Sequence, residues 1–262
     1  MKKLLPSILI FSSLALADEI KFGVNYLKMD YVETSKEGKF LDSEKSEYKD
    51  IGGFNLSYTK HLTALKQDKQ LTSLELSLRY FKGDTNYDGF LQSTITGQII
   101  SPYKTITNNE IIEPKIRIKQ TAYTSNYDAS IFVSYGYRQW ERVITGPYGL
   151  KEVYDWQYYD VGISGTFYDG SWDIGFEVAY QEAIKPKMKA YIKGGLNFDL
   201  GDTKGYYYKI PLGYNFNKNW RLETFYEYNQ WKIKASNVVS GFYEPDSTTK
   251  NKIIGFNISF IF

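Results

Sequence analysis

The chain of 262 residues carries 32 lysine and arginine residues against 30 aspartate and glutamate residues, with one histidine and no cysteine. This near balance of charge excludes the strongly basic surface of a nucleic-acid-binding protein. The lack of cysteine excludes a disulfide framework, so the fold itself must supply the stability. No run of eighteen apolar residues follows residue 17, which excludes a transmembrane helix.

The first 17 residues have the layout of a secretory signal peptide. Lys2 and Lys3 form a basic start, residues 4–14 are an apolar run, and residues 15–17 read Ala-Leu-Ala, a small-x-small cleavage site. We therefore expect residues 1–17 to be a signal peptide and the mature chain to begin at Asp18. Without the two lysines the basic and acidic counts are equal, since 32 − 2 = 30.

The rest of the chain alternates between apolar and polar residues in ten segments, the period of a β-strand with two different faces. The connections alternate between long and short, and the longest is residues 82–109. Pro114 and Pro211 fall inside strands, where we expect bulges to absorb their missing amide donors. No linker divides residues 18–262, so we expect one domain. The ten predicted strands are 19–32, 51–60, 72–81, 110–122, 128–142, 153–168, 171–181, 206–216, 220–234 and 251–262.

Two short turns fix the expected pairing of their strands. A two-residue turn at Asp169-Gly170 would place Phe167 opposite Trp172 and Val161 opposite Val178. A three-residue turn at 217–219 would place Tyr214 opposite Leu222, Ile210 opposite Tyr226, Tyr208 opposite Tyr228 and Lys209 opposite Glu227. In both hairpins the apolar faces then match, which supports the antiparallel reading.

The last strand is apolar at every second residue and ends on an aromatic side chain: Ile254, Phe256, Ile258, Phe260 and Phe262. This ending resembles the C-terminal signal that the assembly machinery of bacterial outer-membrane β-barrels reads, with Phe262 as the signal residue. Together with the signal peptide and an aromatic content of 18%, it makes residues 18–262 resemble a small bacterial outer-membrane β-barrel protein.

The resemblance implies an all-β fold: a single-chain antiparallel transmembrane barrel of about 10 strands, with short periplasmic turns and long extracellular loops. It implies a location in the outer membrane of a Gram-negative bacterium. The implied partners are outer-membrane lipid and lipopolysaccharide, the barrel assembly machinery and an unidentified extracellular ligand. Neither nucleic acid nor a cofactor is expected.

By the parity of the strands, the lumen would hold an ionic network of mixed sign. Its members are Glu75, Arg79, Glu113, Arg117, Arg138, Glu177, Lys209 and Glu227. One strand register would place Glu75 opposite Arg117 and Arg79 opposite Glu113, with Leu76 opposite Ile116. Charged groups away from water need partners, so we interpret the network as structural filling of a narrow lumen rather than a binding or catalytic site.

Other candidate chemistry is weaker. Proteases of the omptin type pair a histidine with aspartates near the extracellular rim, and barrel lipid A deacylases place a histidine beside a serine. The one histidine, His61, shares a face with Ser57 but is predicted at the periplasmic end. Asp84 and Asp88 are predicted in a loop, as a turn or, less favoured, a calcium site. We therefore expect no catalytic, cofactor-binding or metal residues, and a non-enzymatic surface barrel for contact or envelope integrity. A small solute pore and a barrel enzyme acting on lipid or peptide are the alternatives.

Overall fold

The computed structural model describes residues 19–65, 70–92, 99–192 and 194–262, so the predicted signal peptide, residues 1–17, lies outside the described residues. Within the described part, no helix is long and apolar enough to cross a membrane. The strands are β1 (Glu19–Thr34), β2 (Phe40–Lys45), β3 (Ile51–Leu65), β4 (Gln70–Gln92), β5 (Ile99–Tyr123), β6 (Tyr127–Ile144), β7 (Lys151–Asp169), β8 (Trp172–Ala190), β9 (Leu196–Asp199), β10 (Thr203–Asn215), β11 (Trp220–Ile233) and β12 (Asp246–Ile261).

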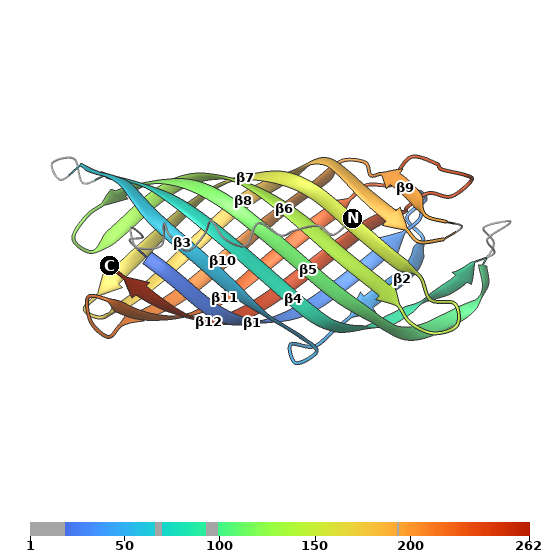
Figure 1. The fold of residues 1–262 in the computed structure, drawn as a ribbon, viewed down its shortest axis with the longest axis horizontal. Helices are drawn as coiled ribbons and strands as arrows, with labels where there is room; N and C mark the ends of the chain where they lie inside the picture. The colour runs from blue at the N-terminus through green and yellow to red at the C-terminus, as the bar shows by residue number, and fades with distance from the viewer. Residues whose placement is uncertain (1–18, 66–69, 93–98, 193) are drawn as a thin grey trace, which may run out of the picture.

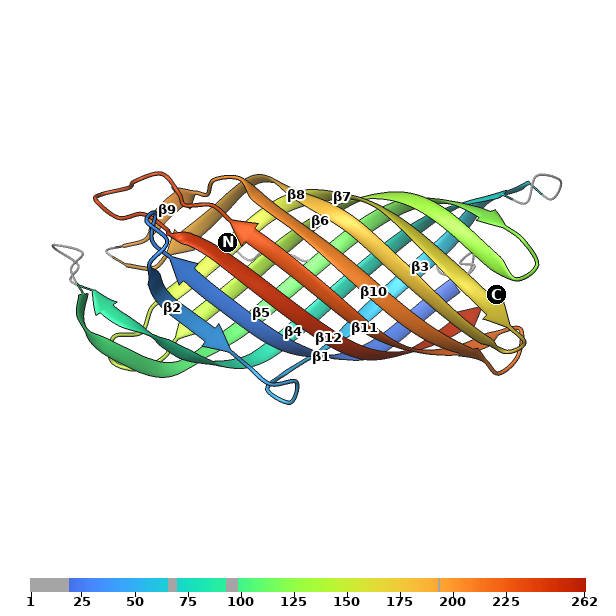
Figure 2. The ribbon, with the colours of Figure 1, turned by 180° about the vertical axis from the view of Figure 1, so that it is seen from behind.

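The ten long strands form a closed antiparallel barrel (Figures 1 and 2). Around the ring they follow the order β1, β3, β4, β5, β6, β7, β8, β10, β11 and β12. The ring closes because β12 pairs with β1 over its whole length, from Glu19 opposite Ile261 to Thr34 opposite Asp246. Each predicted strand coincides with one of these ten. β2 and β9 are short additions in two long connections.

The short connections and the long connections lie at opposite ends of the barrel. β1 begins and β12 ends at the same end, where β6 follows β5 after residues 124–126 and β8 follows β7 after residues 170–171. β2 and β9 lie at the other end (Figure 1). We call these the inner end and the outer end, because short turns face the periplasm in barrels of this kind.

A belt of outward-facing apolar side chains surrounds the inner half of the barrel. Ile131 is 66% exposed, Ile163 53% and Phe176 49%, exposures that make sense in lipid. Tyrosines lie at its outer edge: Tyr26, Tyr80, Tyr135, Tyr159, Tyr180, Tyr206 and Tyr228. The next outward residues on these or neighbouring strands are polar and include Lys28, Lys82, Glu110, Gln157, Glu182, Lys204 and Lys252. The membrane-spanning segments therefore end at this level, and the strands continue beyond it.

The predicted connection at residues 82–109 is largely wrong. β4 continues to Gln92 and β5 begins at Ile99, and the two remain paired through Asp84 opposite Asn108 and Asp88 opposite Lys104. Beyond Lys82 the outward residues of β4 are polar as far as Asp88, because this part of the hairpin lies outside the belt. The apolar alternation that identifies a strand in lipid is therefore absent although the strand continues.

Pro114 and Pro211 both lie within strands, and the expected bulges are absent. β5 and β6 share the same register on either side of Pro114, and β8 and β10 do so on either side of Pro211. Each proline interrupts the ladder on one side only. Pro114 still faces Leu78 of β4, and Pro211 still faces Phe225 of β11.

The predicted register is confirmed for two strand pairs and corrected for a third. Tyr214 lies opposite Leu222 and Lys209 opposite Glu227, as the turn at 217–219 predicted. The β4–β5 register is also as predicted. Between β7 and β8 the register differs by two residues, because Asp169 pairs with Trp172 and the turn is Gly170-Ser171. Gly170, at φ 61, supplies the positive φ that the first position of such a turn requires.

Candidate functional site

The inner half of the lumen contains a polar cavity of about 460 Å³. Seven of the eight predicted network residues line it: Glu75, Arg79, Glu113, Arg117, Glu177, Lys209 and Glu227. Arg138 lies deeper, beside a second and much smaller gap. The ionic side chains therefore surround an open space, which corrects the interpretation of the network as a filling of a narrow lumen.

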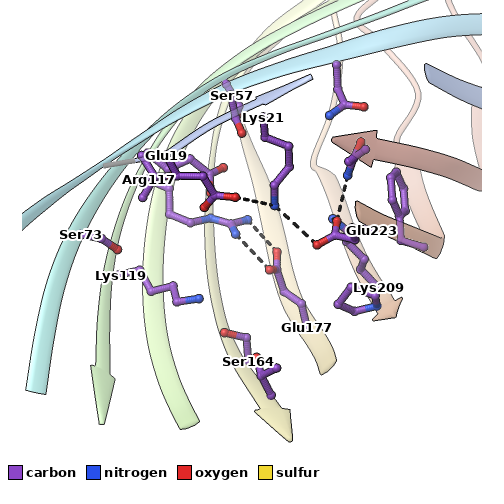
Figure 3. A pocket seen from close by; sticks show the side chains of 18 of the residues that line it. Glu19, Lys21, Ser57, Ser73, Arg117, Lys119, Ser164, Glu177, Lys209 and Glu223 are labelled. Carbon is purple, nitrogen blue, oxygen red and sulfur yellow. Dashed lines mark hydrogen bonds and ion pairs between the residues drawn. The ribbon is translucent and has the colours of Figure 1, made fainter. Parts of the chain in front are cut away.

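Two of the ion pairs on this wall connect strands that are not neighbours. Arg79 of β4 binds Glu227 of β11 at 2.7 and 2.9 Å. Arg117 of β5 binds Glu177 of β8 at 2.7 and 3.0 Å (Figure 3). The strand register places Arg79 opposite Glu113 and Arg117 opposite Glu75. Neither arginine pairs with the glutamate opposite it, and both instead bind glutamates on more distant strands.

The remaining predicted members are held differently. Arg138 donates to Glu113 at 3.1 Å, and Tyr158 donates to the other oxygen of Glu113 at 2.6 Å. Within the described part of the chain, Glu75 forms no ion pair shorter than 4.0 Å. Lys209 donates to Glu223 at 3.3 Å.

Glu223 is the centre of a second ionic group near the inner end. Lys21 of β1 approaches it at 3.5 Å (Figure 3). Arg221 donates to it at 2.8 Å and to Asp173 of β8 at 2.6 Å. Lys21 was missed as a lumen residue. It shares the inward parity of Gly23 on the same strand, which is the signal that identifies it.

Between the cavity and the outer end, a layer of buried apolar side chains fills the cross-section of the lumen. Nine of the ten barrel strands contribute to this layer, and only β10 does not. The members of the layer, each at most 3% exposed, are Leu27, Ile51, Phe81, Ile111, Trp140, Tyr154, Trp156, Met188, Trp231 and Ile253. Trp140 stacks on Tyr154 at 5.1 Å between ring centroids, and Trp156 meets Trp231 edge-on at 5.3 Å. We call this the aromatic layer. It separates the cavity from the outer end.

Beyond the aromatic layer, at the outer end, lies another buried ionic group around Arg142. Arg142 of β6 is fully buried and donates to Glu44 of β2 at 2.6 Å and to Glu152 of β7 at 2.7 Å. Its Nη1 also lies 3.4 Å from Glu33 of β1. Tyr154 donates to Glu244, in the connection at residues 234–245. The parity of Arg138 points to an inward Arg142, but the carboxyl groups come from separate segments and no sequence spacing relates them.

The residues weighed for catalysis or metal binding lie apart. His61 of β3 lines the cavity near the inner end, opposite Ser73 of β4, and Ser57 lines the same cavity. Asp84 and Asp88 lie on strand β4 rather than in a turn. Asp84 accepts from Asn108 and Asp88 from Lys104, each at 2.7 Å. Among the described residues, no group of three or more histidine, cysteine, aspartate and glutamate side chains is arranged to hold a metal ion.

The barrel resembles solved structures of outer-membrane proteins. The outer membrane protease OmpT from Escherichia coli superimposes with a TM-score of 0.62, at 11% identity over 94% of this chain and 97% of that chain. The chain therefore has the fold of an outer-membrane β-barrel. The apolar belt independently places it in a membrane.

Two further outer-membrane structures match less well. The translocator domain of the autotransporter NalP from Neisseria meningitidis has a TM-score of 0.45, at 8% identity over 94% of this chain and 89% of that chain. An outer-membrane channel from Pseudomonas putida F1 has a TM-score of 0.40, at 10% identity over 94% and 96%. No family model matches the sequence. No curated protein matches it either.

Proposed function

We propose that this protein is a closed, non-enzymatic outer-membrane barrel that presents a rigid surface to the cell exterior. The aromatic layer is the observation that carries the proposal. A solute entering the inner cavity meets side chains such as Trp140, Trp156 and Trp231, none of which is more than 2% exposed. Because packed interiors leave few gaps larger than a water molecule, this layer blocks passage.

The outer end supports a role in contact. β4 and β5 project beyond the belt as a paired hairpin, and apolar side chains remain exposed where this end faces water. Ile99, Ile100 and Tyr148 are 55%, 67% and 66% exposed. Exposed apolar groups outside the membrane favour binding to another surface.

The position of the histidine argues against the enzyme alternative. OmpT, the solved structure that matches with a TM-score of 0.62, is a protease. In this chain the one histidine lies in the inner half, on the other side of the aromatic layer from the acidic groups around Arg142 at the outer end. His61→Ala and Ser57→Ala variants should therefore behave as the unmodified protein does. Loss of a cellular phenotype in either variant, at unchanged protein level, would favour an enzyme.

Conductance tests the closed lumen directly. Purified protein in planar lipid bilayers should show no steady current, because the aromatic layer leaves no continuous water path. Long-lived channel openings from the unmodified protein would overturn this proposal and establish the small solute pore.

The contact role needs a separate test in cells. An Ile99→Ser, Ile100→Ser, Tyr148→Ser variant should reach the outer membrane in normal amounts and yet reduce attachment of cells to an epithelial monolayer. Phe216→Ser, an equally exposed aromatic position at the inner end, is the matched control. Equal attachment by all three strains, at equal surface levels, would contradict the contact role.

A further inference from the structure

The buried group around Arg142 has far more acidic than basic side chains. Five carboxyl groups surround one guanidinium: Glu33, Asp42, Glu44, Glu152 and Glu244. We call these residues, with Arg142, the outer carboxyl cluster. Each of the six is at most 8% exposed. If every carboxyl group were ionised the cluster would carry a net charge of −4, since −5 + 1 = −4, and isolated buried charge of this kind is strongly unfavourable.

Glu44 is the carboxylate that Arg142 neutralises. It accepts two hydrogen bonds from Arg142, at 2.6 and 3.1 Å, and one each from Thr85 and Thr107, at 2.7 and 2.9 Å. These four hydrogen bonds satisfy the Glu44 carboxyl group. For the other four carboxyl groups, the only arginine nitrogen left is Nη1 of Arg142, which contacts Glu152 and Glu33.

The strand register places two of these four directly against one another. Glu33 of β1 lies opposite Asp42 of β2. Like charges at directly opposed positions are destabilising. In addition, Asp42 accepts from Tyr87 through one oxygen, at 3.1 Å, while its other oxygen is buried with no hydrogen-bond partner. A buried carboxylate oxygen without a donor favours the protonated acid over the anion.

The cluster joins segments that are otherwise only partly attached to the barrel. The titratable groups that face it are Tyr31 and Glu33 from β1, Asp42 and Glu44 from β2, Tyr87 from β4, Arg142 from β6, Glu152 and Tyr154 from β7, and Glu244 from the 234–245 connection. β2 pairs with β1 and briefly with β4. The 234–245 connection has one isolated bridge, and backbone hydrogen bonds join Lys234 and Asn237 to residues 199–202.

We propose that the outer carboxyl cluster is a proton-operated latch, which holds β2 and the 234–245 connection over the aromatic layer while Asp42, Glu152 and Glu244 are protonated and releases them when these ionise. The structural basis is the combination of a single arginine, opposed acids and a buried carboxyl oxygen without a donor. Release would expose the outer side of the aromatic layer, because Tyr154 of that layer accepts a hydrogen bond from Arg142 at 3.0 Å and donates one to Glu244 of the connection.

The titration range follows from burial outside the membrane belt. Burial raises the pKa of Glu152 to about 7, against the opposing effect of Arg142 and with further increases from Glu33 and Glu44. Burial, followed by the charge of Glu33, raises the pKa of Glu244 and of Asp42 well above their ordinary values. Burial also raises the pKa of Tyr31, Tyr87 and Tyr154, so these hydroxyls stay neutral donors.

The direction of the effect is fixed by these shifts. Between the ordinary glutamate pKa of 4.5 and about 7, the closed cluster binds more protons than the opened one. The stability of the latch is therefore fully present at acidic pH and is lost as the pH rises through about 7. For each proton that the closed cluster binds and the opened one does not, the equilibrium constant for closing falls about tenfold per pH unit in this range.

Hydrogen exchange at several pH values tests the latch in the full-length protein in lipid nanodiscs. After correction for intrinsic exchange rates, peptides covering residues 31–46 and 234–247 should lose protection between about pH 5 and about pH 8. Peptides from the belt portion of β10 should not. In a Glu152→Gln, Glu244→Gln variant the two outer segments should stay protected at the higher pH, because the amides cannot ionise. Glu182→Gln, at a more exposed acid just beyond the belt, is the matched control.

The contrary results are equally clear. Protection of the outer segments that does not change with pH, or a loss that the double variant shares with the unmodified protein, overturns the proposal. Restoration of protection at the higher pH by added magnesium or calcium chloride alone would also overturn it, in favour of a metal site. If the double variant fails to fold, Asp42→Asn serves in its place and should reduce the pH dependence.

Discussion

Arg79 on β4 forms a bidentate ion pair with Glu227 on β11 inside the lumen, with N–O distances of 2.7 and 2.9 Å. Glu227 is only 2% exposed to solvent. β3, β1 and β12 separate these strands around the ring. The pair therefore braces two walls of the barrel on either side of the β1–β12 seam, where the chain closes on itself.

Removing one member of this pair should be costly. Arg79→Ala leaves the Glu227 carboxylate buried without its guanidinium, a loss of about 3–5 kcal/mol in the free energy of unfolding. The double variant, with Glu227→Ala as well, should lose less than the sum of the two single variants. Urea unfolding in lipid vesicles, followed by tryptophan fluorescence, measures this difference.

An exposed ion pair provides the control for the brace. Lys104 and Asp88 lie 2.7 Å apart with side chains 73% and 53% exposed, and Lys104→Ala should cost about 1 kcal/mol or less. If Arg79→Ala costs no more than Lys104→Ala, or if the losses at Arg79 and Glu227 simply add, the brace does not exist.

A second prediction concerns the space beside Tyr158. A Cβ atom at Gly136 would lie 2.5 Å from the Tyr158 ring, and Tyr158 donates to Glu113. Gly136→Val should displace the ring, weaken that hydrogen bond and lower the free energy of unfolding by about 1–3 kcal/mol.

The matched control is Gly52→Val, at a strand glycine with no atom within 4 Å of its would-be Cβ. It should change stability by about 0.5 kcal/mol or less. Equal effects of the two substitutions would show that strand propensity, rather than the ring at Tyr158, decides the outcome.

How well the sequence predicts the strands depends on whether their outward side chains face lipid or water. In the belt, lipid selects apolar residues at every second position, so all ten strands and the inward set from Glu75 to Glu227 could be identified. Beyond Lys82 both faces of β4 meet polar surroundings, and the period of two is no longer visible. There the strand ends could not be predicted.

Partners across the lumen were out of reach for a different reason. Parity shows that Arg79, Glu113 and Glu227 point inward, and a turn such as 217–219 fixes neighbouring strands. Neither specifies which side chain on a distant wall lies within reach, because that depends on the curvature and stagger of the closed ring. The outer carboxyl cluster was missed for the same reason, since Glu44 and Arg142 meet only after closure.

The terminal residue should be required for assembly. Phe262 is 55% exposed and packs edge-on against Phe260 at 4.9 Å, at the inner end of the closing strand. Deleting Phe262 should leave the protein degraded or in the periplasm, as measured by membrane fractionation. Phe216→Ala removes a similarly exposed aromatic group from a turn at the same end and should assemble normally. Normal outer-membrane levels of the Phe262 deletion would contradict an assembly role.

The last prediction identifies which layer closes the lumen. Trp156 and Trp231 face each other from β7 and β11, and both are almost completely buried within the aromatic layer. A Trp156→Ala, Trp231→Ala variant should show a steady current in planar bilayers, because it removes two of the largest side chains that separate the inner cavity from the outer end. An Arg79→Ala, Arg117→Ala, Arg138→Ala variant enlarges the cavity but leaves the aromatic layer in place, and it should stay closed. A current from the arginine variant and none from the tryptophan variant would show that the ionic side chains, rather than the aromatic layer, seal the barrel.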